Sequence, residues 1–394
     1  MKILFILFFT SLALGHLVAI PISSTAVLYL HDMLLILILL VSSVRLIVFR
    51  RNIAWPRLTK PILLFMSIGG ISLLVNSSRF TQPELITSSL YLFRWVAYGA
   101  LYGVVVSGKL DPRFFVRGLY GAGLVITLLG IAQFFFYPDL RNLYYLGWDP
   151  HYQRLFSTLL DPNFSGLLFV LMFSHTSFVF SRKQNILRFL CMTLILSALL
   201  LTFSRSSYIA FAASLITVGI VLKKWKDILL MLAFFIVLIL LLPKSGEGQN
   251  ITRITSSLAR LENWQEGWQL FVRYPLFGHG FNTLRYVRMT TDQYLLSGEI
   301  ITSRALSGLD NSILFILATT GIVGFAAYAW IGKRMIMLAS QLNKEDGHIK
   351  AMYISMLVAV LIHSLFTNSL FYPWVMIWLW FMTGTIERRI RARK

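Results

Sequence analysis

Long apolar runs recur along this chain from one end to the other, and each is long enough to cross a bilayer as a helix. Of the 394 residues, 57% are hydrophobic and only 13% are charged. Soluble domains carry about 25% charged residues, and a soluble core could not cover this much apolar surface. We therefore predict an all-α, polytopic integral membrane protein that folds as a single membrane domain over residues 1–394.

The apolar runs predict about twelve transmembrane helices. We place them at residues 3–20, 27–49, 61–76, 85–107, 114–137, 163–181, 186–203, 207–222, 227–243, 311–331, 350–368 and 371–387. For the first run a signal peptide is the alternative, because Lys2 precedes a short apolar stretch. No small-x-small cleavage site follows it, which favours a retained span.

The net charge of +20 lies largely in short loops between the apolar runs. These clusters are Arg50, Arg51, Arg57 and Lys60; Lys109 and Arg113; Arg182, Lys183 and Arg188; Lys223, Lys224 and Lys226; Lys333, Arg334, Lys344 and Lys350; and the tail Arg388, Arg389, Arg391, Arg393 and Lys394. With about twelve spans they all fall on one side, which the positive-inside rule makes the cytoplasm. Both termini are then cytoplasmic in a multi-pass protein of the cell (inner) membrane. Such a pattern reflects topology, and we expect no nucleic-acid partner.

On the opposite side the basic residues are almost all arginines, with Lys244 the lone lysine. They are Arg79, Arg141, Arg154, Arg205, Arg253, Arg260, Arg273, Arg285, Arg288 and Arg304. Arginine presents a planar, permanently charged fork that suits phosphate oxygens. Snorkelling, or pairing with Glu262, Glu266 or Glu299, is the structural alternative for each of them.

Two arginines lie where charge is costly. The short turn Ser204–Ser207 places Arg205 at the outer surface or just inside it, and a charge at membrane depth usually marks function. Arg94 falls inside a predicted span, where an ion pair with Asp32 is the structural explanation.

The only long hydrophilic stretch, residues 244–310, is predicted to be a large extracytoplasmic loop. Within it Ile254–Phe271 reads as an amphipathic helix, with an apolar face of Leu258, Leu261, Trp264, Trp268 and Phe271. The helix either lies at the headgroup level or packs against the membrane domain. It should end near Tyr274-Pro275, ahead of the tight turn Gly278-His279-Gly280.

Asp310 opens the next span and has two possible roles. Aspartate is a good helix N-cap, and a carboxylate at the outer edge of the membrane can also act as a general base. The single cysteine, Cys191, excludes an intramolecular disulfide. No D-x-D motif or other metal-binding carboxylate pair is evident on the outer side, so we expect no metal and no cofactor.

Four short motifs give the chain a resemblance to the O-antigen ligase and polysaccharide polymerase superfamily. They are Asp161-Pro162-Asn163-Phe164; Leu201-Thr202-Phe203-Ser204-Arg205-Ser206; Arg260-x-x-x-Trp264 leading to Pro275-Leu276-Phe277-Gly278-His279-Gly280-Phe281; and Asp310-Asn311-Ser312-Ile313-Leu314 continuing to Thr320-Gly321-Ile322-Val323-Gly324. Together they extend from Asp161 to Gly324, and the flanking spans fit the layout of the family.

The resemblance implies a membrane-embedded, GT-C-like glycosyltransferase that is inverting and metal-independent. Its donor would be a glycan on undecaprenyl diphosphate. Its acceptor would be another glycan or a lipid-linked unit, and the protein would be surrounded by membrane lipid. Arg205, Arg260 and Arg273, with Arg154 and Arg304, would bind the donor diphosphate. Ligases of the family typically carry a His-Asn pair where this chain has Asp310-Asn311, and that histidine is regarded as the base.

Aspartate can accept the same proton, so we expect Asp310 to be the base, with His279 as the alternative. The departure from histidine favours a polymerase over a ligase that transfers glycan to lipid A–core. A lipid-linked oligosaccharide flippase or other transporter is the alternative from another class. Such proteins usually show internal repeats and polar residues near the membrane midplane, whereas here the polar residues gather in one outer loop.

Overall fold

The computed structural model describes residues 1–22, 27–48, 55–146, 148–179, 185–243, 255–289 and 308–393. Its helices are α1 Lys2–Ala13, α2 Leu30–Val48, α3 Thr59–Val75, α4 Gln82–Ser107, α5 Pro112–Phe136, α6 Pro162–Val179, α7 Asn185–Leu201, α8 Arg205–Leu222, α9 Trp225–Leu240, α10 Thr255–Arg273, α11 Leu284–Met289, α13 Ser312–Ser340, α14 Gly347–Ser364 and α15 Pro373–Arg391. Two strands, β1 Ala19–Pro21 and β2 Val27–Tyr29, pair antiparallel with Ala19 opposite Tyr29.

Each apolar run predicted to span the membrane overlaps a helix. Among the described residues, six helical segments are long and apolar enough to cross a bilayer: α2, α4, α5, α8, α13 and the segment Lys344–Ser364 that contains α14. Helices α1, α3 and α7 are apolar but shorter. The helical, multi-pass character is therefore confirmed, and the full number of twelve spans stays a prediction.

The N-terminal region differs from the predicted span at residues 3–20. Helix α1 ends at Ala13, and the following residues turn into strand β1, so the fold is not purely helical. The turn is fixed at Gly15, which has φ +61°, and the next amide, that of His16, donates to Thr158 O at 2.8 Å. A Cβ on Gly15 would lie 2.1 Å from the same oxygen, so only glycine allows this approach.

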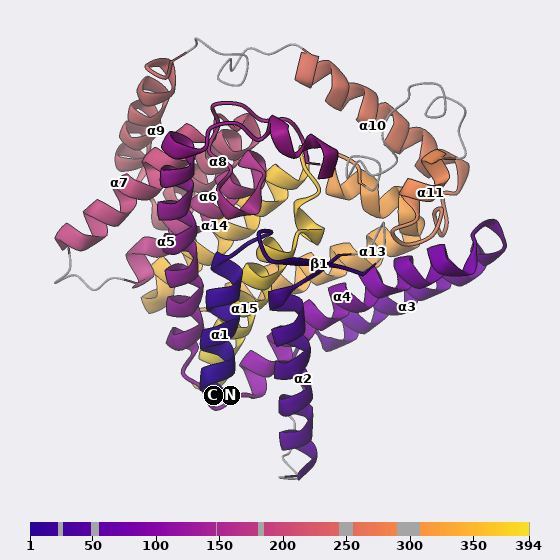
Figure 1. Ribbon diagram of the computed structural model, residues 1–394. Coiled ribbons are helices and arrows are strands. Elements are labelled where there is room, and N and C mark those ends of the chain that lie inside the picture. Colours follow the sequence, from indigo (N-terminus) through magenta and orange to yellow (C-terminus); the bar gives the residue numbers. More distant parts are fainter. Residues whose placement is uncertain are drawn as a thin grey trace.

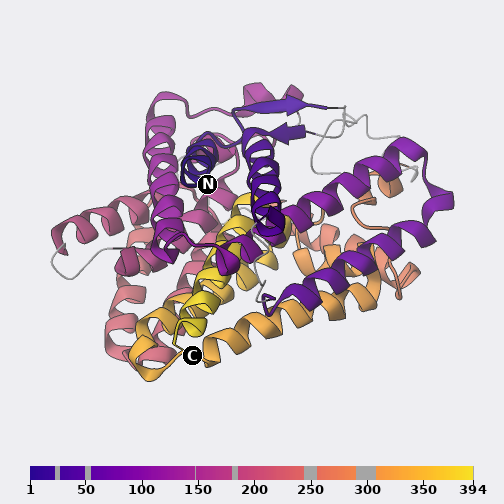
Figure 2. The ribbon, with the colours of Figure 1, turned by 90° about the horizontal axis from the view of Figure 1, so that it is seen from below.

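Helix α15 lies at the centre of the membrane domain. Nearly all its residues from Pro373 to Glu387 are buried, as expected for a helix that is apolar on all sides. Helix α4 packs along α15, α14 packs along α8, and α3 packs along α13. Figure 2 shows the α3–α13 pair from below, running side by side along one edge.

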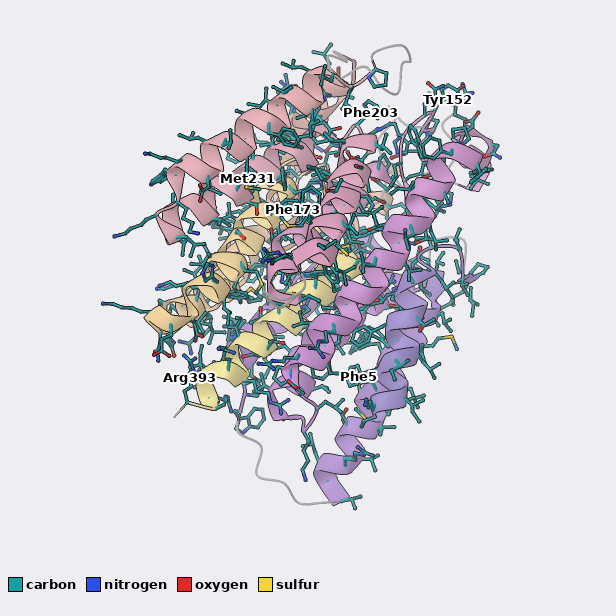
Figure 3. The ribbon with its side chains drawn as sticks, turned by 90° about the vertical axis from the view of Figure 1, so that its left-hand side faces the viewer. Phe5, Tyr152, Phe173, Phe203, Met231 and Arg393 are labelled. Atoms are coloured by element: carbon teal, nitrogen blue, oxygen red, sulfur yellow. The ribbon has the colours of Figure 1, made fainter. Side chains whose placement is uncertain are left out.

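The two ends of the molecule have different contents. Both termini lie at the same end, and α10 and α11 lie toward the other (Figure 1). The side view in Figure 3 likewise separates Phe203 and Tyr152 from Phe5 and Arg393. This arrangement agrees with termini on the side opposite the polar loop, and the assignment of that side to the cytoplasm remains a prediction from charge.

Helix α13 is broken at Gly321, whose backbone has φ +67° and ψ −168°. The loop after α10 fills the break. The amides of His279 and Gly280 donate to the carbonyls of Ala318 and Thr319 at 2.9 and 3.1 Å. Beyond the break, the amide of Ile322 donates to Pro275 O at 2.8 Å. The glycine turn predicted from sequence is thus part of the scaffold, because it satisfies helix carbonyls and amides that the break leaves unpaired.

Helix α3 secures the same junction. Ser72 Oγ lies within 2.6 and 2.7 Å of Phe277 O and Thr319 O, and Asn76 Nδ2 donates to Gly278 O at 3.0 Å. Gly278 has φ +65°, and a Cβ there would lie 2.4 Å from the carbonyl carbon of Thr319. The loop, the broken helix and α3 therefore form one hydrogen-bonded unit beneath the start of α13.

We predict that Gly321→Ala destabilises the protein strongly. The φ/ψ region of Gly321 is essentially restricted to glycine, which alone costs about 1–3 kcal/mol for another residue, and the new Cβ would lie 2.1 Å from Leu276 O. A Cβ on Gly332 in the same helix would meet nothing within 4 Å, so Gly332→Ala is the matched control. Thermal unfolding in detergent should show a large loss for Gly321→Ala only; equal melting temperatures would contradict this role of the break.

Candidate active site

A cavity of about 1240 Å³ opens between the hairpin β1–β2, the loop before α6, the first turn of α8, α10, α11 and the turn that joins α14 to α15. Four residues singled out from the sequence line it: Arg154, Arg205, Arg260 and Asp310. They come from segments more than 150 residues apart in the chain. The cavity is therefore the place where the predicted site residues meet.

Among the helices that begin at this cavity, α6, α8 and α13 have capped N-termini. Asp161 Oδ1 accepts from the amides of Asn163 and Phe164 at the start of α6. Ser204 caps α8, and Asn311 Oδ1 accepts from Ile313 N and Leu314 N at the start of α13. Helix N-termini carry partial positive charge, so their convergence favours an anion in the cavity.

The turn that presents Arg205 is held rigidly. Phe203 adopts φ +49°, and Arg154 donates from Nε to Thr202 O at 2.9 Å and from Nη2 to Phe203 O at 3.3 Å. Ser204 Oγ donates to Asn163 Oδ1 at 2.8 Å, which joins the starts of α8 and α6. Arg205, the first residue of α8, is half-buried at the cavity wall.

Beneath this turn, Ser206 extends the network to α14. Its hydroxyl lies 3.2 Å from Nε2 of the buried His363, whose Nδ1 lies 2.6 Å from Ser369 Oγ. Helices α6, α8 and α14 are therefore tied together by buried polar contacts directly under Arg205. A satisfied network of this kind fixes one arrangement, because breaking any member leaves a buried polar group unpaired.

Arg154 both lines the cavity and supports the turn that carries Arg205. It lines the cavity, but its side chain is almost fully buried, and its Nε and Nη2 donate to the two carbonyls that precede the Arg205 turn. Arg154 therefore stabilises that turn through these two hydrogen bonds.

Helix α10 supports Asp310 from the other side. Asn263 Oδ1 accepts from the Asp310 amide at 2.7 Å, and Trp264 Nε1 donates to Asp310 O at 3.3 Å. Arg288 of α11 forms two 2.7 Å bonds with Glu266 and one of 2.8 Å with Gly308 O, which confirms ion pairing with Glu266 as its role. These contacts place the Asp310 carboxylate at a cavity that Arg260 also lines.

The capping role considered for Asp310 is wrong, because Asn311 caps α13. The structure shows no hydrogen bond to the Asp310 carboxylate from the residues it describes. The Asp310 side chain is exposed to the cavity, but protein surrounds the carboxyl group and partly desolvates it, which raises its pKa. The positive charges of Arg260 and Arg288 act in the opposite direction and lower this pKa. A raised pKa makes a carboxylate a stronger base.

The amphipathic helix is α10, and it ends at Arg273, immediately before Tyr274-Pro275 as predicted. Leu258, Leu261 and Trp268 on its apolar face are more than half exposed. Gly267 and Leu270 are buried, where α10 packs on α13. An outward apolar face agrees with a helix at the headgroup level that is also docked on the membrane domain.

Two predicted residues that the structure describes, His279 and Arg273, do not line the cavity. His279 is buried, with Nε2 3.0 Å from Leu270 O and Nδ1 3.4 Å from Arg79 Nη2. Burial lowers the pKa of its imidazole to about 4, and Arg79 and Arg273 also act to lower it. Arg273 is exposed at the end of α10 outside the cavity lining, and Arg304 lies outside the described residues.

Comparison with known protein families agrees with the geometry. Residues 190–329 match the family model described as O-antigen ligase. Over this segment the match supports the predicted resemblance to the O-antigen ligase/polymerase superfamily. The comparison with curated proteins finds no match.

The O-antigen ligase segment contains Arg205, Arg260 and Asp310, together with the broken helix α13. Other parts of the cavity wall come from outside it. Arg94, which lines the cavity from α4, forms the predicted ion pair with Asp32 at 2.7 Å. Arg285 of α11 also lines the cavity, and nothing in the local sequence separates it from the other outer arginines.

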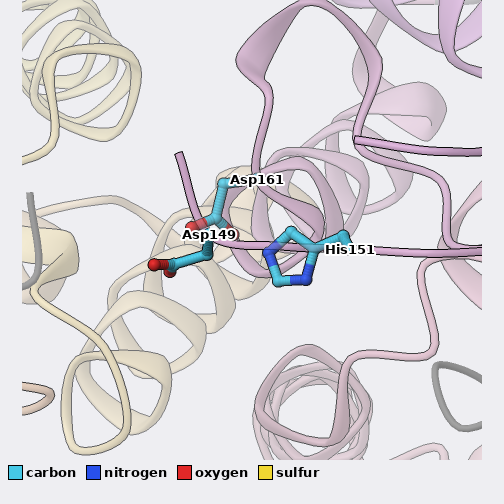
Figure 4. Close-up of side chains that lie close together, drawn as sticks. All are labelled: Asp149, His151 and Asp161. Carbon is cyan, nitrogen blue, oxygen red and sulfur yellow. The ribbon is translucent and has the colours of Figure 1, made fainter. Parts of the chain in front are cut away.

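One cluster in the cavity bears on the expectation that no metal-binding carboxylate pair lies on the outer side. Ligand atoms of Asp149, His151 and Asp161 lie within 4.8 Å of one another (Figure 4). Carboxylate and imidazole are ligand types for a divalent cation. Two features oppose that use: Asp161 Oδ1 already accepts two backbone bonds, and Arg154 places positive charge 3.5 Å from His151 Nδ1. The residues therefore fit a metal poorly.

We predict that Asn311→Ala lowers stability by about 1 kcal/mol, because it removes the cap of α13, whereas Asp310→Ala leaves the melting temperature nearly unchanged. Thermal unfolding of both variants in detergent measures the difference. A larger loss for Asp310→Ala than for Asn311→Ala would return the capping role to Asp310.

Proposed function

We propose that this protein is a membrane-embedded glycosyltransferase that extends or transfers undecaprenyl-diphosphate-linked glycan on the outer face of the cell membrane, and that it is a polymerase. The observation that carries the proposal is one cavity lined by the Asp310 carboxylate together with Arg205 and Arg260. When a hydroxyl group attacks a sugar diphosphate, a base must accept its proton and fixed positive charge must stabilise the leaving diphosphate.

The mechanism follows from these residues. The acceptor hydroxyl attacks the anomeric carbon of the donor sugar on the face opposite the diphosphate, and its proton passes to the Asp310 carboxylate. The new C–O bond forms as the bond from the sugar to the diphosphate oxygen breaks. The lipid diphosphate leaves with its charge stabilised by Arg205 and Arg260. Attack from the opposite face inverts the anomeric configuration.

Positive charge for the leaving group is available without a metal. Arg205 and Arg260 line the same cavity, and the N-termini of α6, α8 and α13 add their partial charges. Because the Asp149–His151–Asp161 cluster fits a cation poorly, we propose a metal-independent reaction with no cofactor.

Of the other predicted residues, Arg154 acts through the Arg205 turn that it braces. His279 is less suited to be the base than Asp310, because it is buried in the scaffold away from the cavity lining. The cavity volume of about 1240 Å³ is large enough for an oligosaccharide acceptor. A glycan or lipid-linked unit as acceptor is therefore part of the proposal, with ligation to lipid A–core as the alternative.

The position of the cavity favours an enzyme over a flippase. It lies at the ends of the helices, where α6, α8 and α13 begin. A transporter typically binds its substrate near the midplane between repeated halves. We place this end outside the cell, with both termini in the cytoplasm.

We predict that Asp310→Asn folds normally and binds donor, but lowers glycan transfer by about 10²–10⁴-fold, the usual contribution of a general base. The assay follows elongation of labelled lipid-linked oligosaccharide by the purified protein in proteoliposomes. For the wild type, activity should fall with decreasing pH at a higher pH than for an ordinary aspartate, because the pKa of Asp310 is raised and the base must be ionised.

Asp139→Asn is the matched control, since Asp139 is an exposed carboxylate paired with Arg141 outside the cavity lining. Near-normal transfer by Asp310→Asn would remove Asp310 as the base. Movement of labelled lipid between leaflets by the wild type, with the glycan unchanged, would instead identify a flippase.

We predict that Arg205→Lys weakens donor binding by about ten-fold or more, because a charged hydrogen bond contributes about 1.5–3 kcal/mol and lysine keeps the charge but loses the fork. The measurement is the KM for lipid-linked donor, with Arg141→Lys as control for an exposed arginine. If both Arg205→Lys and Arg205→Ala retain wild-type activity, Arg205 does not bind the diphosphate.

A further inference from the structure

A second group of side chains in the cavity is not used by the chemistry above. It consists of the aromatic residues Trp148, Phe164 and Tyr372, and of the carboxylates and imidazole of Asp149, His151 and Asp161. Most of these residues precede the O-antigen ligase segment, and Tyr372 follows it. They therefore form a part of the cavity that the family match does not cover.

The aromatic residues form one continuous wall. The rings of Phe164 and Tyr372 stack with centroids 3.6 Å apart and planes 2° from parallel. His16 connects them to Trp148: its Nε2 lies 3.0 Å from the Tyr372 hydroxyl, and its ring centroid lies 5.0 Å from that of Trp148. Trp148, Phe164 and Tyr372 are each half-buried, so part of each side chain remains exposed.

The polar residues lie beside this wall. Asp149 follows Trp148 directly, Asp161 lies three residues before Phe164, and both carboxylates gather with His151 within 4.8 Å (Figure 4). Asp149 is exposed, and Asp161 and His151 are half-buried. Asp161 accepts both backbone hydrogen bonds at the start of α6 on the same oxygen, Oδ1. Carboxylates accept hydrogen bonds, and imidazole can accept or donate.

The wall begins next to the proposed diphosphate site. Asn163, beside Phe164, accepts the 2.8 Å hydrogen bond from Ser204, and Ser204 precedes Arg205. A sugar attached to a diphosphate at Arg205 would therefore meet the start of α6 first. Charge also connects the two regions, because burial raises the pKa of Asp161 and the carboxylate of Asp310 acts in the same direction.

We propose that Trp148, Phe164 and Tyr372, with Asp149, His151 and Asp161, form the subsite that binds the glycan of the lipid-linked donor. This inference rests on the proposed function. A pyranose ring presents an apolar C–H face that packs on an aromatic ring, and hydroxyl groups at its rim donate to carboxylates. Pockets that combine aromatic walls with a few placed polar groups bind and orient such ligands.

Two other occupants fit less well. A polyprenyl tail is apolar and would desolvate the carboxylates and the imidazole, which is unfavourable. A divalent cation meets the positive charge of Arg154 beside His151. A sugar uses both the rings and the polar groups, so it accounts for the whole set.

The test compares two ligands on the full-length protein in nanodiscs: synthetic undecaprenyl diphosphate without sugar, and lipid-linked oligosaccharide extracted from the source cells. We expect Trp148→Ala to weaken binding of the sugar-bearing lipid roughly five- to ten-fold, in the range of one aromatic contact, and to leave undecaprenyl diphosphate binding unchanged. Arg205→Ala should weaken both. Trp225→Ala, at an exposed tryptophan outside the cavity lining, is the matched control.

Asp149→Asn is the second variant, because Asp149 is exposed and the change keeps its size. It should also weaken only the sugar-bearing lipid. Equal effects of Trp148→Ala and Asp149→Asn on both ligands, or no effect on either, would overturn the glycan subsite. So would loss of wild-type binding on adding a chelator, which would identify a metal site. Wild-type protein that binds the sugar-bearing lipid but never transfers glycan would overturn the proposed function and leave the subsite standing.

Discussion

The structure depends on the break in α13 at Gly321. A helix that continued through this point would have no free carbonyls for the loop after α10, which donates to Ala318 and Thr319 across the break. Because Ser72 and Asn76 of α3 bind the same loop, the junction fixes three elements at once. The segment just above it carries Asp310, so the position of the proposed base follows from the geometry of one glycine.

The proposed site joins two such rigid units. One is the junction at α13, with α10 attached to the Asp310 segment through Asn263 and α11 attached to α10 through the Arg288–Glu266 pair. The other is the buried network of Asn163, Ser204, Ser206 and His363 under Arg205. Each unit contributes one chemical function, a base or a cation, to the cavity between them. Preorganised groups of this kind lower a barrier because they need not reorganise during the reaction.

Much of this arrangement could be predicted from the sequence. The helices follow from apolar runs, including the start of α6, placed at residue 163 and observed at Pro162, and the end of α10 follows from Tyr274-Pro275. The strand pair after α1 was missed because its residues continue an apolar run, and only the contact of His16 with Thr158 shows that the helix has stopped. The sequence left capping open as one of two roles for Asp310, because Asp310 and Asn311 are both good caps and local sequence does not decide between them.

The sequence by itself determined that this protein lies in a lipid bilayer, how many apolar runs it has and which residue types are available for chemistry. Hydropathy and charge can be read from each segment alone, because they are local properties. Only the tertiary structure decided which of the outer arginines share a cavity with Asp310, that His279 belongs to the scaffold, and that Asp149, His151 and Asp161 meet. The physical reason is that these outcomes depend on contacts between segments far apart in the chain. Arg154, for example, acts on a turn 48 residues further along, and no periodicity records that hydrogen bond.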